Sequence, residues 1–329
     1  MNMLVTGGAG YIGSVTAQAL QDAGHQVVVV DDLSTGHAEA VPQGARLVVA
    51  DLADTATMTR LMAEERIEAV VHFAALSLVG ASLREPLPYY RHNVGGALAL
   101  LEACSSAGVE RFVLSSTAAV YGTPSAVPIG EAAALRPESV YGETKLAVER
   151  LLHWLSVTRG LGYAALRYFN AAGAAPGRGE DHEPETHLIP LVLQAALGQR
   201  DEVRVFGEDY DTEDGTAVRD YVHVEDLASA HVLALEALQP GRGEAYNLGN
   251  GSGFSVREVI EVCRSVTGAD LRVTQAPRRA GDPPVLVADA GKAAAELGWR
   301  PRRTALEDIV GSAWEWHSSH PHGYGRRRT

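Results

Sequence analysis

Short apolar runs alternate with longer amphipathic stretches along the first half of the chain. The short runs occupy residues 3–6, 26–30, 46–50, 69–73, 111–115 and 164–168. Between them, helices are predicted where apolar residues recur every three or four positions, as in Ile12, Val15, Ala19 and Ala23, and again over residues 89–107. Strands that alternate with helices in this way predict an α/β fold with a doubly wound parallel sheet.

A glycine-rich turn follows the first of these strands. Residues 7–13 read GGAGYIG and lead directly into a helical pattern. Gly7, Gly10 and Gly13 suit a tight turn, close approach of the backbone to a pyrophosphate, and close packing of the helix. The amides at the start of that helix would face the phosphates. In this context the glycines predict a Rossmann dinucleotide site.

Polar or small residues follow the next strands. Asp31 and Asp32 end the second run, where a carboxylate can accept hydrogen bonds from the adenosine ribose and would repel a 2′-phosphate. The pattern therefore favours NAD over NADP. Residues 51–52 and 73–75 follow later strands, and ligands of doubly wound sheets bind beyond such carboxyl ends.

Candidate chemistry lies between residues 115 and 145. Residues 115–121 read SSTAAVY at the end of a strand, and residues 141–145 read YGETK at the head of a helix. Tyr141 and Lys145 are four residues apart and share a helix face, so the ammonium would lower the pKa of the phenol. Thr117 could complete a hydrogen-bond chain to Tyr141. The same spacing occurs by chance on many helices, and a nicotinamide site nearby is what gives it a catalytic meaning.

The composition changes after Ala171. Residues 173–184 are rich in glycine, proline and charge, so we place a domain boundary near them. We predict a dinucleotide-binding domain over residues 1–171 and a smaller mixed α/β substrate domain over residues 172–329. A strand and helix within 219–238 are expected to return to the first domain. Further elements are predicted at residues 188–197, 203–206, 255–266 and 306–316.

The helix after Tyr141 carries an apolar stripe of Val148, Leu151, Leu152 and Leu155. With the helix near residues 98–104 this stripe could form a dimer face, and packing into the core is the alternative. A homodimer is the expected assembly.

Composition narrows the possible partners. The formal net charge is −13, which argues against nucleic acid or an acidic membrane surface. Met1 leads straight into an apolar strand, so we expect neither a targeting segment nor a membrane span, and a cytoplasmic location. Cys104 and Cys263 show no metal-ligand spacing. We expect both to be reduced core residues and expect no metal site.

Taken together, these stretches resemble the extended short-chain dehydrogenase/reductase family over almost the whole chain. The matching N-terminal motifs are residues 6–13, 71–75, 115–122 and 141–145. Those in the second half are residues 166–170, 210–215, 218–223, 246–249 and 276–282. The later motifs are more specific to one activity, because dehydratases, decarboxylases and reductases share the N-terminal ones.

The resemblance implies epimerisation at C4 of a UDP-hexose, which interconverts UDP-glucose and UDP-galactose with tightly bound NAD. Tyr141 would remove the proton of the sugar 4-hydroxyl, with Thr117 in the hydrogen-bond path, while C4 gives a hydride to NAD. The transient 4-ketosugar would rotate and regain the hydride on its other face. Lys145 would lower the pKa of Tyr141 and hydrogen-bond the nicotinamide ribose.

The resemblance also implies the ligand contacts. The residues expected to bind the cofactor are Gly7, Gly10, Tyr11, Ile12, Gly13, Asp31, Asp32, Leu33, Ser34, Asp51, Leu52, Phe73, Ala74, Ala75, Ser77, Asn93, Ser115, Tyr141, Lys145 and Phe169. Those expected to bind the UDP-sugar are Thr117, Tyr141, Tyr168, Asn170, His187, Leu188, Phe206, Arg219, Tyr221, Arg279, Asp282 and Leu286. Among the latter, the two arginines and Asn170 would hold the diphosphate, Tyr221 and Asp282 the ribose, and Phe206 the uracil.

The sequence departs from the family pattern at several positions. Ser77 stands where many relatives have a lysine, and His92 precedes Asn93 where two asparagines are common. His187 replaces a frequent asparagine beside the sugar. Leu286 occupies the position that helps to set sugar size, and an aliphatic side chain there leaves open whether N-acetylated sugars are accepted.

Other functions remain to be weighed. A 4-epimerase of a UDP-N-acetylhexosamine or a UDP-pentose would use the same machinery. A nucleotide-sugar dehydratase needs an acid and a base after the active-site threonine, where this chain has Ala118 and Ala119. A non-catalytic NAD-binding protein could dispense with Tyr141 and Lys145, which this chain retains.

Overall fold

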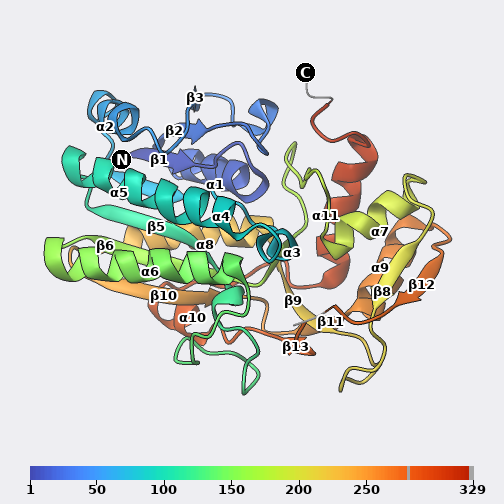
Figure 1. Cartoon of the computed structure of the whole chain (residues 1–329). Helices are drawn as coiled ribbons and strands as arrows, with labels where there is room; N and C mark the ends of the chain where they lie inside the picture. The colour runs from blue at the N-terminus through green and yellow to red at the C-terminus, as the bar shows by residue number, and fades with distance from the viewer. Residues whose placement is uncertain (280–281, 326–329) are drawn as a thin grey trace.

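The computed structural model describes residues 1–279 and 282–325. Within these residues, seven parallel strands form one sheet in the order β10-β6-β5-β4-β1-β2-β3, on the left of Figure 1. The strands are β1 (Asn2–Thr6), β2 (Gln26–Asp31), β3 (Arg46–Val49), β4 (Ala69–His72), β5 (Arg111–Thr117), β6 (Gly162–Tyr168) and β10 (Gly243–Leu248). β1, β4, β5 and β6 are buried along almost their whole length, as expected for a parallel sheet covered on both faces.

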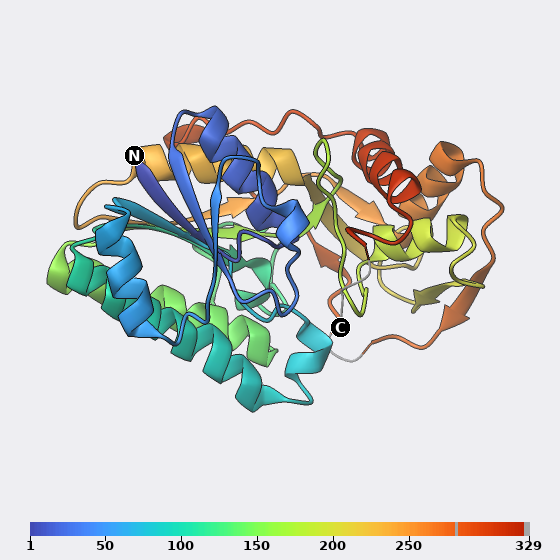
Figure 2. The same cartoon turned by 90° about the horizontal axis from the view of Figure 1, so that it is seen from above.

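Helices cover both faces of this sheet, as Figure 2 shows. One face carries α1 (Tyr11–Asp22), α8 (Val224–Ala237) and α10 (Gly291–Glu296), whose apolar side chains share a core with β1 and β2. The opposite face carries α2 (Thr55–Glu64), α5 (Gly96–Ala107) and α6 (Val140–Arg159), which form a second core with β4 and β5. The predicted doubly wound α/β fold is therefore confirmed.

The helix predicted over residues 89–107 is divided in the structure. It comprises α4 (Pro86–Tyr89), a π-helical segment (Tyr90–Gly95) and α5. The π-helical segment carries Asn93, whose side chain accepts from the amide of Leu76 at 2.8 Å and donates to its carbonyl at 3.0 Å. Such π-helical segments often lie at functional sites, and here one ties the loop after β4 to the helix layer.

The rest of the chain forms a smaller unit, on the right of Figure 1. One small sheet contains β7 (Asn170–Ala172), β9 (Val218–His223), β11 (Gly253–Ser255) and β13 (Val285–Leu286), and a second pairs β8 (Val203–Phe206) with β12 (Val273–Ala276). Around a third core pack α7 (Leu188–Ala196), α9 (Val256–Thr267) and α11 (Leu306–Ser319). Cys263 lies in this core and Cys104 in the α5 layer, and both are buried and unpaired.

Three elements from the second half of the sequence, β10, α8 and α10, lie in the larger unit. β10 pairs in parallel with β6 and forms the edge of the seven-stranded sheet. α8 packs beside α1, where Val224 and Ala228 contact Tyr11 and Val15. Three short helical turns complete the described elements: Ala38–Ala40, Ala118–Val120 and α3 (Val79–Ser82).

Candidate active site

The carboxyl end of β5 and the start of α6 bring Thr117, Tyr141 and Lys145 together. Ser139 caps α6 by accepting from the amide of Gly142 at 3.1 Å, which places Tyr141 in the first helical turn. The Thr117 side chain hydrogen-bonds the Tyr141 hydroxyl. Lys145, which is only 3% exposed, donates from Nζ to the carbonyl of Ser115 at 2.8 Å.

Gly142 allows this close approach. A Cβ atom at Gly142 would lie 2.5 Å from the carbonyl oxygen of Ala119 and 3.2 Å from Pro137. Only a residue without a side chain can therefore sit where α6 meets the turn after β5. The glycine within the predicted motif thus has a packing role beside the chemistry.

Burial dominates the electrostatics of Tyr141 and Lys145. It raises the pKa of Tyr141 to about 12, and the hydrogen bond with Thr117 acts in the opposite direction. Burial lowers the pKa of Lys145 to about 8, and the nearby Glu149 carboxylate raises it. The acidic phenol expected from a neighbouring ammonium is not produced by these side chains alone, because removal of water from the phenolate outweighs their attraction.

The glycine turn has the shape that a dinucleotide requires. Gly7 has φ +70°, and a Cβ there would lie 2.5 Å from the amide nitrogen of Ala74; a Cβ at Gly13 would lie 2.2 Å from the Gly7 carbonyl oxygen. α1 begins after Gly10 with no side-chain cap among the described residues and no acid in its first turn. The amides of Tyr11, Ile12 and Gly13 therefore lie at a helix start suited to phosphate. These residues fit the predicted cofactor.

Asp31 is bound to the same turn. Its carboxylate accepts from the amides of Ala9 at 3.0 Å and Leu33 at 2.9 Å, and burial raises its pKa. Leu33 itself has a positive φ of 59°, and Asp32 accepts from the amide of Ser34 at 2.8 Å. Asp31 thus positions the glycine turn, and a carboxylate retains further lone pairs for a ribose hydroxyl.

Of the other predicted cofactor residues, three lie directly after β4, and three more differ in how deeply they are buried. Phe73 and Ala74 both donate their amides to the Thr6 carbonyl, so the ends of β1 and β4 adjoin, and Ala75 follows them. Leu52 is buried, whereas Asp51 and Ser77 are exposed.

On the substrate side, β9 aligns several predicted residues. Asn170 on β7 is opposite Tyr221, and Leu286 on β13 is opposite Arg219. Arg219 forms an ion pair with Asp282. The guanidinium of Arg279 lies over the Phe206 ring, 4.2 Å from its centroid, a cation–π contact that keeps a cation beside an aromatic plane.

Leu286 and Phe169 link the two units. Both pack against a small core that contains Ala118 and Leu146, next to Thr117 and Lys145 in sequence. Tyr168 hydrogen-bonds the Ser115 hydroxyl, and Tyr141 contributes to the raised pKa of Tyr168. Leu286, the residue predicted to set sugar size, is therefore close to the turn after β5 that carries Thr117 and Ala118.

His187 and Leu188 lie at the start of α7. His187 is the N-cap residue, and its Nδ1 lies 2.6 Å from Glu180 and 2.9 Å from Glu185. Leu188 packs against the core of the smaller unit. Ion-pair partners therefore hold the His187 ring.

A sequence profile named "NAD dependent epimerase/dehydratase family" matches residues 3–249. The chain belongs to this family. Curated UDP-glucose 4-epimerases are similar to it at full length, including a protein of Halalkalibacterium halodurans that is 53% identical over 98% of each chain and one of Streptomyces lividans that is 52% identical over 98% of each.

Solved structures give the same result for this family member. A crystal structure of a UDP-glucose 4-epimerase has a TM-score of 0.96 and 52% identity, over 99% of this chain and 100% of that one. The Stenotrophomonas maltophila UDP-glucose-4-epimerase with bound NAD and formylated UDP-arabinopyranose has a TM-score of 0.94 and 45% identity, over 98% of this chain and 99% of that one.

Two residues, Ser82 and Glu149, contact the segments that carry Tyr141 and Thr117 and were not predicted from the sequence. Ser82, fully buried, accepts from the amide of Tyr141 at 3.1 Å. Glu149 forms a buried ion pair with Arg167, whose Nε donates to its Oε1 at 3.0 Å, and also accepts from Ser116. The signal for Glu149 was an acid on the helix face of Lys145, one turn later.

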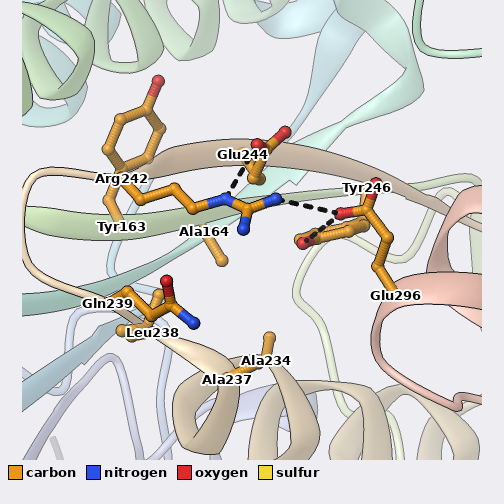
Figure 3. Close-up of a pocket in the computed structure, with 10 residues that line it drawn as sticks. All are labelled: Tyr163, Ala164, Ala234, Ala237, Leu238, Gln239, Arg242, Glu244, Tyr246 and Glu296. Atoms are coloured by element: carbon orange, nitrogen blue, oxygen red, sulfur yellow. Dashed lines mark hydrogen bonds and ion pairs between the residues drawn. The ribbon is translucent and has the colours of Figure 1, made fainter.

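A pocket of the described chain lies away from this site. It has a volume of about 300 Å³ and opens beside the first residues of β6 and β10, where Arg242 joins Glu244 and Glu296 (Figure 3). The predicted ligand residues lie at the opposite, carboxyl ends of the strands. None of them lines this pocket, so it has no part in the proposed chemistry.

Across residues 1–279 and 282–325, the helices are all too short or too polar to span a bilayer.

Proposed function

We propose that this family member is an NAD-dependent isomerase that interconverts UDP-glucose and UDP-galactose by epimerisation at C4. The observation that carries the proposal is the contact of Thr117 with the Tyr141 hydroxyl, beside the buried Lys145, at the carboxyl end of β5. Full-length identity of about half to curated UDP-glucose 4-epimerases identifies the reaction.

In this proposal Tyr141 is the general base and acid for the sugar 4-hydroxyl. It removes the proton of the sugar 4-hydroxyl through the hydrogen bond shared with Thr117, and returns it after the sugar has turned. Bound NAD supplies reversible hydride transfer at C4, which these side chains cannot provide. Lys145 contributes positive charge, and any further positive charge near the phenol would lower the pKa of Tyr141 from about 12 towards neutrality.

The nucleotide is held by the smaller unit. Arg219 and Arg279 bind the diphosphate, because forked guanidinium groups suit phosphate oxygens. Phe206 stacks on the uracil beside Arg279, with which it already forms a cation–π pair. Asn170, the first residue of β7, and Tyr221, opposite it within β9, complete the predicted contacts.

Conversion without added cofactor tests the function. Purified protein incubated with UDP-galactose and no added NAD should form UDP-glucose, measured by chromatography, because the hydride returns to the sugar and tightly held NAD is not consumed. A folded protein with no conversion would remove the assignment. Elimination to a 4-keto-6-deoxy sugar is not expected, because Ala118 and Ala119 cannot exchange protons.

The division into domains is part of the proposal. Residues 1–171 would form the NAD-binding domain and residues 172–329 the UDP-sugar domain, with the segment 219–238 returning to the first. The packing of α8 against α1 supports this return for the helical part of the segment, whereas β9 pairs with β7, β11 and β13 in the smaller unit.

We further propose that the protein is a cytoplasmic homodimer. The stripe predicted on α6 packs into the core, because Val148 and Leu152 are buried and Leu151 and Leu155 pack against that core. Other apolar residues of α5 and α6 are exposed, among them Leu98, Trp154 and Val157 at 45%, 63% and 63%, and they suit contact with a second copy. Trp154→Lys should yield a monomer in sedimentation velocity, and an unchanged dimer would refute this interface. The buried, unpaired cysteines are in keeping with a reducing compartment.

A further inference from the structure

A cluster of four potential metal ligands lies in the loop before α7. Glu180, His182, Glu185 and His187 each offer one ligand atom, and these four atoms lie within 4.8 Å of one another. Glu180 and Glu185 are only 5% and 9% exposed. Buried carboxylates are rare unless they are paired or bind a cation.

The spacing of these atoms is that of a small coordination shell. His187 Nδ1 lies 2.6 Å from Glu180 and 2.9 Å from Glu185, and His182 Nδ1 lies 3.1 Å from Glu180 and 3.8 Å from Glu185. Four ligands at about 2.0–2.1 Å around a tetrahedral zinc ion are separated by roughly 3.3 Å. These four imidazole–carboxylate separations, which involve both oxygens of Glu185, run from 2.6 to 3.8 Å, and the four ligand atoms lie within 4.8 Å of one another. The side chains would therefore shift to bind an ion between them.

We propose that Glu180, His182, Glu185 and His187 bind one Zn²⁺ ion. Two imidazole nitrogens and two carboxylate oxygens form a tetrahedral set that suits zinc, whereas Ca²⁺ and Mg²⁺ require six or more oxygens. The two carboxylates balance the charge of the ion. All four ligands come from the chain, so the site would be structural. No metal site was predicted from the sequence, where Cys104 and Cys263 lack metal-ligand spacing, whereas these four ligands are glutamates and histidines.

The ion would fix the loop between the two units. Tyr11, from the glycine turn, donates its hydroxyl to the carbonyl of Gly173 at 2.6 Å, and its ring lies 6.5 Å from that of His182. His37, after β2, contacts Asp181 at 3.3 Å. The cluster therefore adjoins both the cofactor turn and the start of α7, and a metal would direct His187 towards Glu180.

Metal binding to the full-length protein tests the site. Protein treated with a chelator and then dialysed should take up one Zn²⁺ per chain, measured by elemental analysis, and should gain thermal stability. Co²⁺ at the same site should give the intense visible absorption of a tetrahedral complex. Glu180→Gln and His182→Ala each remove one ligand, and each should weaken Zn²⁺ binding by more than the roughly 10- to 100-fold that outer-shell changes cost.

A matched control lies in the same loop. Glu183 is exposed and outside the cluster, so Glu183→Gln should bind Zn²⁺ as the unmodified chain does. Absence of saturable Zn²⁺ uptake, or equal affinity in Glu183→Gln and His182→Ala, would overturn the proposal and leave the four residues as an ion-pair cluster. His182 is less buried than Glu180, which keeps the test decisive if Glu180→Gln does not fold.

Discussion

Tyr141 is the residue on which the proposed chemistry most directly depends. Tyr141→Phe keeps the ring and its packing but removes the proton acceptor, so turnover should fall by about 10²- to 10⁴-fold. Bound NAD, measured after denaturation, should remain. Tyr90→Phe is a matched control, because Tyr90 is 43% exposed, and its rate should not change. A near-normal rate for Tyr141→Phe would exclude Tyr141 as the base.

Leu286 offers a test of substrate range. It packs beside Ala118 in the small core next to the catalytic turn. Leu286→Tyr adds bulk there, and should lower kcat/KM for UDP-N-acetylgalactosamine relative to UDP-galactose by about tenfold or more, a typical effect of pocket size. Leu286→Met conserves volume and should leave the ratio unchanged. An unchanged ratio in the tyrosine variant would mean that another residue limits sugar size.

At this scale, the sequence predicted the residues that share a local pattern. Tyr141 and Lys145 lie one helical turn apart and Thr117 follows a recognisable strand, and this spacing, together with the glycine-rich turn of a dinucleotide site, made them candidates. Ser82 could not be found in this way, because its contact with the Tyr141 amide spans 59 positions. The raised pKa of Tyr141 could not be predicted from the sequence either, because burial rather than Lys145 dominates it.

Replacing a glycine by alanine is expected to have opposite effects on stability in two helices, α11 and α1. Gly311, inside α11, has open space where a Cβ would lie, whereas a Cβ at Gly13 would be 2.2 Å from the Gly7 carbonyl oxygen. Gly311→Ala should raise the free energy of unfolding by about 0.5–1 kcal/mol. Gly13→Ala should lower it and reduce NAD retention. Urea denaturation and cofactor content measure both, and a destabilised Gly311→Ala would contradict the argument.

Individual elements were predicted well where apolar runs are long and bounded. β1, β2, β3, β4, β5 and β6 begin and end close to their predicted positions, because buried parallel strands require uninterrupted apolar residues, whereas β10 was not predicted as a strand. The π-helical segment at Tyr90–Gly95 was not foreseen. Within it, the Asn93 side chain contacts Leu76, and no helical period within the segment reveals such a contact.

For the whole molecule, buried histidines should make stability depend on pH. Burial lowers the pKa of His231 to about 4, whereas an unfolded histidine titrates near about 6.5. Between these values the unfolded chain binds more protons, so the free energy of unfolding falls as the pH decreases from 6.5 to 4.

His231→Leu should make this pH dependence shallower by about 1 kcal/mol per pH unit between pH 4.5 and 6. Denaturation at several pH values measures the slope. His153→Gln, at an exposed position on α6, should retain the slope of the unmodified chain. An equal slope in the His231 variant would show that His231 is not the group that titrates.

The arrangement of the whole chain was the hardest feature to predict. The alternating pattern indicated a parallel sheet, but β10 joins its edge after a gap of more than seventy residues from β6. Nothing in the six residues of this strand, which include Glu244 and Asn247, specifies its neighbour. The loop before α7 gave no helical or strand period either, and only the folded chain brings its four potential ligands together.

The ion pair between Arg219 and Asp282 has a consequence for ligand choice. The Asp282 carboxylate already neutralises the charge of Arg219, so an incoming anion has to displace this carboxylate from the guanidinium. A monovalent anion gains little by that exchange, whereas a group with two or more charges that also reaches Arg279 gains a second cation. We therefore expect that monovalent inorganic anions do not displace Asp282 from Arg219, and that a nucleoside diphosphate does.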